Sequence, residues 1–241
     1  MRLIKVLLMW LGLMAGAAVA QSPPPVAAPA SDPHNILHLQ LSTGGEVVIL
    51  MRPDKAPLSV ERVRTLARAG FYDGVIFHRV IDGFMAQTGD PKGTGEGGSP
   101  LPDLKAEFND LPHLRGVVSM ARTDKPDTAN SQFFICFQPT IRLDGKYSAI
   151  GRVTSGMQFV DAITRGDADG RVLENPSKIV RAWIEADGTN AARVPLVIPP
   201  APLAPIAAPP APAAPPAAAP AAPNGPAPAP PTLVKAPKRH K

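Results

Sequence analysis

The sequence predicts an all-β domain in which short strands form a barrel or sandwich plugged by two helices. Apolar and polar residues alternate over short runs, which is typical of half-buried strands. A glycine-rich turn joins the first two runs, and only two segments have helical spacing. The fold class rests on these features, all of which lie between chain ends rich in proline and alanine.

The first two strands are expected at residues 36–41 and 45–51. In ILHLQL the three leucines fall on one side of the strand, and Ile36, His38 and Gln40 fall on the other. GEVVILM follows after the turn at Thr43-Gly44-Gly45. The two runs together predict a hairpin.

A helix is expected in APLSVERVRTLARAG. Leu58, Val63 and Leu66 recur at roughly helical spacing along this segment. Pro57 suits the first helical turn, because its missing N–H is not needed there, and Gly70 suits the position after the last turn.

Five later runs predict strands and one predicts a short helix. The strands are expected at VIFHRVI (75–81), GVVSMAR (116–122), SQFFICF (131–137), SAIGRV (148–153) and SKIVRAWIEA (177–186), and the helix at GMQFVDAIT (156–164). In SQFFICF one face carries only Phe133, Ile135 and Phe137 and should belong to the core. The other face carries Gln132, Phe134 and Cys136, which suits a peptide-binding wall.

The first 20 residues have the features of a cleavable signal peptide. Arg2 and Lys5 precede an apolar stretch that is short for a membrane span, and Ala18-Val19-Ala20 fits a small-x-small cleavage site. An uncleaved membrane anchor is the alternative. We therefore expect an exported protein, most simply a periplasmic one.

The remaining boundaries follow from composition. Residues 21–33 form a Pro/Ala linker, residues 34–193 the folded domain, and residues 194–241 a disordered Pro/Ala-rich tail with a basic end. The tail holds more than half of the chain's 31 prolines, and proline stops both helices and sheets from propagating. Extended polyproline II is the expected state of the tail.

Charge and cysteine content exclude several function classes. The net charge of +5 comes from the predicted signal peptide and the tail end, so the folded domain is close to neutral and lacks the basic stripe of a nucleic-acid-binding domain. Cys136 is the only cysteine, so no internal disulfide can form. Cys136 is expected to be a small packed residue in a strand rather than a catalytic thiol. The five histidines have no metal-ligand spacing, and no metal site is predicted.

Five sequence blocks resemble one known family. FHRVIDGFMAQTGDP, GTGEGG, GVVSMAR, NSQFFICF and LDGKYSAIGRV occur in the order found in cyclophilin-type peptidyl-prolyl cis-trans isomerases, and the resemblance covers roughly residues 35–187. It implies a closed eight-stranded antiparallel barrel capped by two α-helices. It also implies a substrate groove on the outer surface of the barrel.

The resemblance carries specific residues into that groove. Arg79 and Gln87 would be the catalytic residues, and the substrate-binding residues would be Phe84, Met85, Ala121, Gln132, Phe134, Leu143 and Tyr147. Strict strand alternation separates Phe84 from Met85 and Gln87, so we expect an irregularity or strand end there, helped by Gly83. His78 is expected to be structural.

The implied reaction explains these residue types. Rotation about an X-Pro bond must cross a barrier of about 18–20 kcal/mol, because twisting breaks amide resonance. No covalent bond changes, so no nucleophile, metal or cofactor is required; the site must bind the twisted amide more tightly than either planar form. An apolar pocket would hold the proline ring, and Arg79 would donate to the prolyl nitrogen. Gln87 would orient Arg79 and the substrate carbonyl.

Four positions depart from the family pattern. Arg142 stands where the commonest eukaryotic form has Trp, which predicts weak inhibition by cyclosporin. Tyr147 replaces the usual His, Thr88 a frequent Gly, and Arg122 the usual Asn after Ala121. The last change puts one backbone-directed contact in doubt.

The leading hypothesis is a peptidyl-prolyl isomerase that acts on proline-containing polypeptides during the folding of exported proteins, as a monomer. The alternative is a non-catalytic peptide-binding or chaperone module that uses the groove only to hold chains. The basic tail end KAPKRHK could tether the protein electrostatically to an anionic envelope surface, or the tail has no partner.

Overall fold

The computed structural model describes residues 31–198. The predicted signal peptide, most of the linker and the tail from residue 199 onward lie outside these residues. Within them, no helix is both long and apolar enough to cross a membrane.

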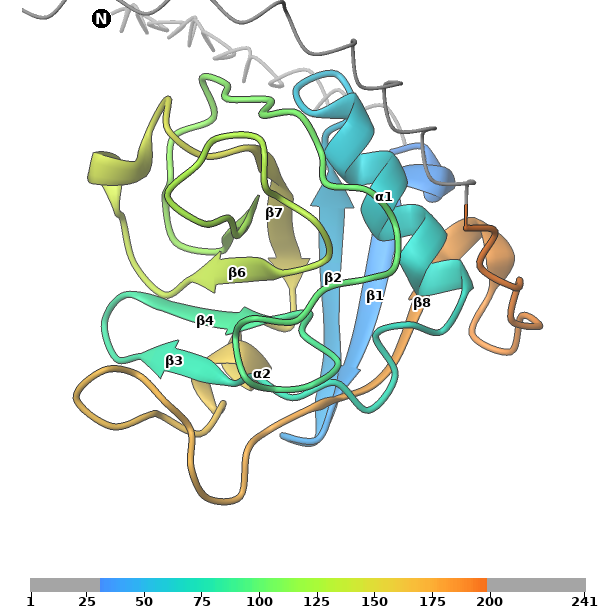
Figure 1. Ribbon diagram of the computed structural model, residues 1–241. Coiled ribbons are helices and arrows are strands. Elements are labelled where there is room, and N and C mark those ends of the chain that lie inside the picture. The colour runs from blue at the N-terminus through green and yellow to red at the C-terminus, as the bar shows by residue number, and fades with distance from the viewer. Residues whose placement is uncertain (1–30, 199–241) are drawn as a thin grey trace, which may run out of the picture. The chain divides into compact units, whose positions relative to one another are not determined.

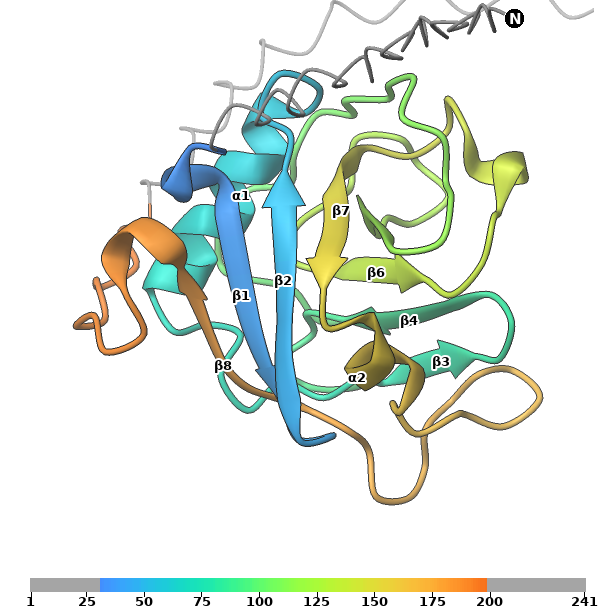
Figure 2. The same ribbon diagram turned by 180° about the vertical axis from the view of Figure 1, so that it is seen from behind.

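Eight strands form one antiparallel sheet in the order β3-β4-β6-β5-β7-β2-β1-β8 (Figures 1 and 2). The strands are β1 (Ile36–Leu41), β2 (Gly45–Met51), β3 (Arg79–Ile81), β4 (Met85–Thr88), β5 (Val117–Met120), β6 (Phe133–Cys136), β7 (Ala149–Ser155) and β8 (Ile179–Ile184). The helices are α1 (Pro57–Arg68) and α2 (Met157–Asp161), with 3-10 turns η1 (Pro33–Asn35), η2 (Ile141–Leu143) and η3 (Glu185–Asp187). The predicted fold class is confirmed.

The barrel is not closed by a complete ladder, and in this respect the prediction was wrong. The terminal strands β3 and β8 do not pair with each other; only the residues before β3 make irregular backbone contacts with the start of β8 and the segment before it, such as Phe77 N–H to the Ser177 carbonyl at 2.8 Å. The loop before β8 covers the free edge of β3 instead, because Val80 N–H donates to the Gly170 carbonyl at 2.6 Å and Gly166 N–H donates to Val80 at 2.9 Å. A loop that covers an edge also protects it from pairing with other chains.

The β1–β2 hairpin and α1 build the main core as the sequence predicts. Leu37, Leu39 and Leu41 are at most 1% exposed, and α1 packs against β8 beside them (Figure 1). One helical position was wrong: Leu58 is 51% exposed, and Val60 faces the core in its place. The core-facing stripe of α1 is Val60, Val63 and Leu66, so it begins two residues later than expected.

The helix ends of α1 match their sequence signals. Pro57 is the first helical residue, and Gly70 adopts φ = +72° two residues after the helix ends. Gly70 N–H bonds to the Ala67 carbonyl and Phe71 N–H to the Leu66 carbonyl, both at 3.0 Å. This pair of bonds is a Schellman motif, which satisfies carbonyls that the helix leaves free.

The sheet separates two apolar clusters. Phe133, Ile135 and Phe137 belong to the large core, as their alternation predicts. On the opposite face lies a small cluster of Met85, Phe134, Cys136 and Leu143, with Ile81, Phe84, Ala121 and Tyr147 packed against it. The small cluster is the apolar floor of the candidate site.

Candidate active site

The β3–β4 hairpin positions the two predicted catalytic residues. Arg79 on β3 lies directly opposite Gln87 on β4 in the antiparallel register, so both side chains leave the same face of the sheet. The turn between the strands contains Gly83 at φ = +64°, a conformation that glycine adopts without strain. Phe84 lies in this turn, immediately before β4, which confirms the expected strand end.

Strand β6 supplies the next part of the site. Its register pairs Phe134 with Gln87 and Cys136 with Met85, so Phe134 stands beside Gln87 on the groove face. The turn η2 and the segment after it add Leu143 and Tyr147. A cavity of about 310 Å³ is lined by Arg79, Phe84, Met85, Gln87, Ala121, Arg122, Phe134, Arg142, Leu143 and Tyr147. Every predicted site residue except Gln132 is therefore in this cavity.

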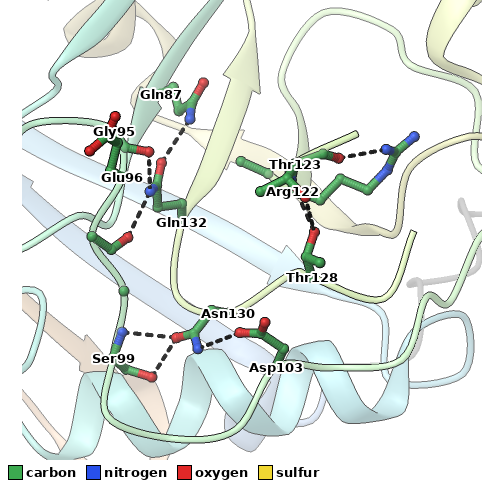
Figure 3. Close-up of a pocket in the computed structure, with 13 residues that line it drawn as sticks. Gln87, Gly95, Glu96, Ser99, Asp103, Arg122, Thr123, Thr128, Asn130 and Gln132 are labelled. Carbon is green, nitrogen blue, oxygen red and sulfur yellow. Dashed lines mark hydrogen bonds between the residues drawn. The ribbon is translucent and has the colours of Figure 1, made fainter. Parts of the chain in front are cut away.

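Gln132 lines a second cavity, which lies next to the first and shares Gln87, Ala121 and Arg122 with it. The Gln87 side-chain amide donates to the side-chain oxygen Oε1 of Gln132 at 2.8 Å. Gln132 in turn donates to the Gly95 and Gly97 carbonyls at 2.9 and 2.8 Å (Figure 3). This chain of bonds fixes Gln87 to the glycine-rich loop.

Asp90 holds the glycine-rich loop in shape. Its carboxylate, 1% exposed as a residue, accepts from the backbone N–H groups of Lys92, Gly95 and Gly97 at 2.8, 2.7 and 3.2 Å. Burial acts to raise the pKa of Asp90, but these donors prevail and the pKa is lowered. The ionised carboxylate is thus part of the loop's structure.

A buried histidine that sequence reasoning missed supports the aromatic wall. His113 is 0% exposed and stacks on Phe134, with 6.3 Å between ring centroids. Its Nδ1 lies 2.8 Å from Asp144 Oδ1 and its Nε2 lies 2.9 Å from Ser119 Oγ. Tyr147 packs edge-on against Phe134 at 5.6 Å. No spacing in the sequence marks His113, because its partners come from distant segments.

Comparisons with known proteins identify the family. The family model described as cyclophilin type peptidyl-prolyl cis-trans isomerase/CLD matches residues 37–184. The chain belongs to this family. Its predicted activity, isomerisation of X-Pro peptide bonds, is confirmed with it.

Individual relatives agree with the family match. A Brucella suis protein named "Probable peptidyl-prolyl cis-trans isomerase" is 48% identical over 188 residues, which cover 73% of this chain and 95% of the relative. Peptidyl-prolyl cis-trans isomerase B of Bacillus subtilis is 43% identical over 53% of this chain and 89% of its own length.

Solved structures show the same fold. A cyclophilin from Hirschia baltica superposes with a TM-score of 0.60 at 28% identity, over 66% of this chain and 77% of that one. A cyclophilin type isomerase from Cryptosporidium parvum was crystallised in the presence of the dipeptide Ala-Pro. It gives a TM-score of 0.58 at 28% identity, over 62% of this chain and 98% of that one.

Arg79 of this cyclophilin-type isomerase projects into the groove without a local partner. Its side chain is exposed, and within residues 31–198 it has no hydrogen bond or ion pair. The expected orienting contact from Gln87 to Arg79 is not formed among the described residues, where the side-chain N–H of Gln87 donates to Gln132. The guanidinium hydrogens therefore stay available to a bound peptide.

Two other residues close to the site are buried: His78, immediately before β3, and Cys136 on β6. Cys136 is 0% exposed, and burial raises the pKa of its thiol to about 12, so it stays protonated in the apolar floor. His78 is 7% exposed, and burial lowers the pKa of its imidazole.

Three departures from the isomerase family pattern acquire a structural role. Thr88 is fully buried and donates to the Ile76 carbonyl at 2.9 Å, so its side chain points away from the groove. The Arg142 guanidinium lies 4.5 Å from the centroid of the Phe84 ring, and that of Arg122 lies 4.6 Å from the Tyr147 centroid. Both arginines thus form part of the cavity wall.

Proposed function

We propose that the cavity around Arg79 is the groove in which this isomerase binds and twists X-Pro bonds. The observation that supports the proposal is the placement of the unpartnered Arg79 guanidinium beside an apolar floor of Phe84, Met85 and Phe134. The floor suits a proline ring, which is apolar and has no N–H to satisfy. The crystallisation of the Cryptosporidium parvum relative with Ala-Pro is consistent with a proline ligand in this family.

Arg79 acts on the transition state in this proposal. In a planar amide the nitrogen lone pair is delocalised and accepts poorly, whereas twisting localises it. A guanidinium that donates to the prolyl nitrogen therefore binds the twisted form preferentially, which is the requirement for catalysis. A guanidinium has five N–H donors and no acceptor, so it can meet the prolyl nitrogen only as a donor.

Gln87 positions the substrate next to Arg79. One amide hydrogen of Gln87 is held by Gln132, which leaves the second hydrogen and the carbonyl oxygen free to meet the peptide backbone. Ala121, Leu143 and Tyr147 complete the binding surface around the proline.

The proposed setting is the periplasm, with exported polypeptides as substrates and a monomeric enzyme. The signal-peptide features of residues 1–20 support this location. The basic tail end would add a weak contact with the anionic envelope surface.

Turnover distinguishes catalysis from the alternative, a module that only holds chains. The assay is the refolding of a protein whose slow phase is prolyl isomerisation, with the enzyme at about one hundredth of the substrate concentration. We expect the slow phase to accelerate in proportion to enzyme concentration, because each enzyme molecule acts repeatedly. An effect that appears only near equimolar protein would support the binding module and overturn the proposal.

A further inference from the structure

The groove carries an unbalanced positive charge. Three of the ten residues that line the 310 Å³ cavity are Arg79, Arg122 and Arg142, and none is an aspartate or glutamate. The folded domain as a whole is close to neutral, so the imbalance is local to the groove.

These three guanidinium groups have no carboxylate partners among the described residues. Arg122 donates to backbone carbonyls instead, to Thr123 at 2.8 Å and to Lys146 at 3.1 Å. Elsewhere in residues 31–198 six arginines do pair with acids: Arg52 with Asp54, Arg64 with Glu61, Arg68 with Asp187, Arg115 with Asp161, Arg165 with Asp82 and Arg193 with Asp73. Arg152 and Arg171 on the exposed surface also lack an acid, so the groove is distinguished by having three such guanidinium groups around one cavity.

Aromatic rings hold two of the groove arginines in place. Arg142 lies over Phe84 and Arg122 over Tyr147, at centroid distances of 4.5 and 4.6 Å. Stacking on a ring face leaves the edge of a guanidinium free to hydrogen-bond, but all three guanidinium nitrogens of Arg122 already donate to neighbouring backbone carbonyls. Arg142 makes no hydrogen bond within the described part of the chain, so its whole donor edge is available to a ligand.

We propose that this groove prefers X-Pro segments in which a residue next to the proline carries a carboxylate. Arg142 provides the preference through its free guanidinium edge, and Arg122 adds to it through its positive charge. The inference rests on the proposed function of the groove. A carboxylate is the group that matches a guanidinium edge, through two parallel N–H···O bonds. A lysine at the same peptide position would instead meet like charge.

The preference should act on KM rather than on kcat. The substrate carboxylate keeps its charge and its place while the neighbouring bond rotates, so the arginines bind ground state and transition state equally. Arg142 gives the clearer test of the two arginines. Arg122 also lines the second cavity, where the acidic residues Glu96 and Asp103 offset its positive charge.

The test measures isomerisation of short peptides by exchange NMR, with each rate referred to the same peptide in buffer. One set places Glu, Gln or Lys before the proline and a second set places them after it. In at least one set we expect kcat/KM for the Glu peptide to exceed that for the Lys peptide about tenfold at low salt. A larger ratio is not expected, because each exposed ion pair contributes only modestly to the binding free energy. The ratio should shrink at high salt, which screens exposed charges.

Variants assign the effect to the groove. Arg142→Gln and Arg122→Gln should each lower the Glu-to-Lys ratio at least twofold, while Arg152→Gln should leave it unchanged, because Arg152 is an exposed arginine on β7 outside both cavities. A wild-type ratio near one in both sets, or an equal loss in the Arg152 variant, would overturn the charge preference while leaving the enzyme intact. Failure to accelerate any peptide would overturn the proposed function, and the preference with it.

Discussion

Replacing His113 by Phe tests how the aromatic wall of the groove is supported. Phenylalanine keeps a ring beside Phe134 but removes both imidazole nitrogens. The hydroxyl of Ser119, a residue that is 0% exposed, therefore loses its partner Nε2 at 2.9 Å. Leaving such a buried hydroxyl unpaired costs about 1–3 kcal/mol. Asp144 loses the bond to Nδ1, worth about 1 kcal/mol, but keeps its bond from the His113 backbone N–H. We expect a loss of about 2–4 kcal/mol.

The double variant with Ser119→Ala separates the two contributions. Removing the hydroxyl as well leaves no orphaned group, so about 1–3 kcal/mol of the loss should return. The free energy of unfolding is measured by urea titration of the wild type, both single variants and the double variant. If the double variant were no more stable than His113→Phe, the Ser119 bond would not be what holds His113.

Three further predictions concern other parts of the molecule. The pKa of Asp90 is lowered in the folded state, so its carboxylate stabilises the fold above its unfolded pKa of about 3.9, and this stabilisation is lost as the pH falls. Asp90→Asn should therefore lose less stability in acid than the wild type. The measurement is the free energy of unfolding by urea titration at several pH values. Cyclosporin should inhibit weakly, since Arg142 stands where the commonest eukaryotic form has Trp, and a nanomolar inhibition constant would contradict this. If the tail tethers the protein, deleting residues 195–241 should reduce its sedimentation with envelope fractions at low salt, whereas equal soluble fractions would refute the tether.

The sequence predicts most of the fold because its strongest patterns are local. The β1–β2 hairpin has the predicted bounds, since alternation and a Gly-Gly turn specify both strands and register. Strand β4 (Met85–Thr88) was not predicted separately, because four residues carry too little alternation to be recognised. The predicted strand at 75–81 shrinks to β3, since the residues before Arg79 bond irregularly to the segment before β8.

The sequence predicted the candidate site only where its residues lie within a recognisable motif. Arg79, Phe84 and Gln87 lie in one block of sequence, so the resemblance alone could bring them together. His113 could not be found this way, because its role depends on Ser119, Phe134 and Asp144 meeting in space. The bond between Gln87 and Gln132 is likewise a product of sheet register, which places β4 beside β6.

The most direct test of the account is the isomerisation rate of Arg79→Ala on an X-Pro peptide, measured beside the wild type and the Arg152→Ala control. Losing a preorganised donor to the transition state should lower kcat about 10²–10³-fold, or about 3–4 kcal/mol, with the fold retained. Arg152→Ala should behave as the wild type. An Arg79→Ala enzyme with an unchanged kcat would contradict the central claim that this guanidinium stabilises the twisted amide.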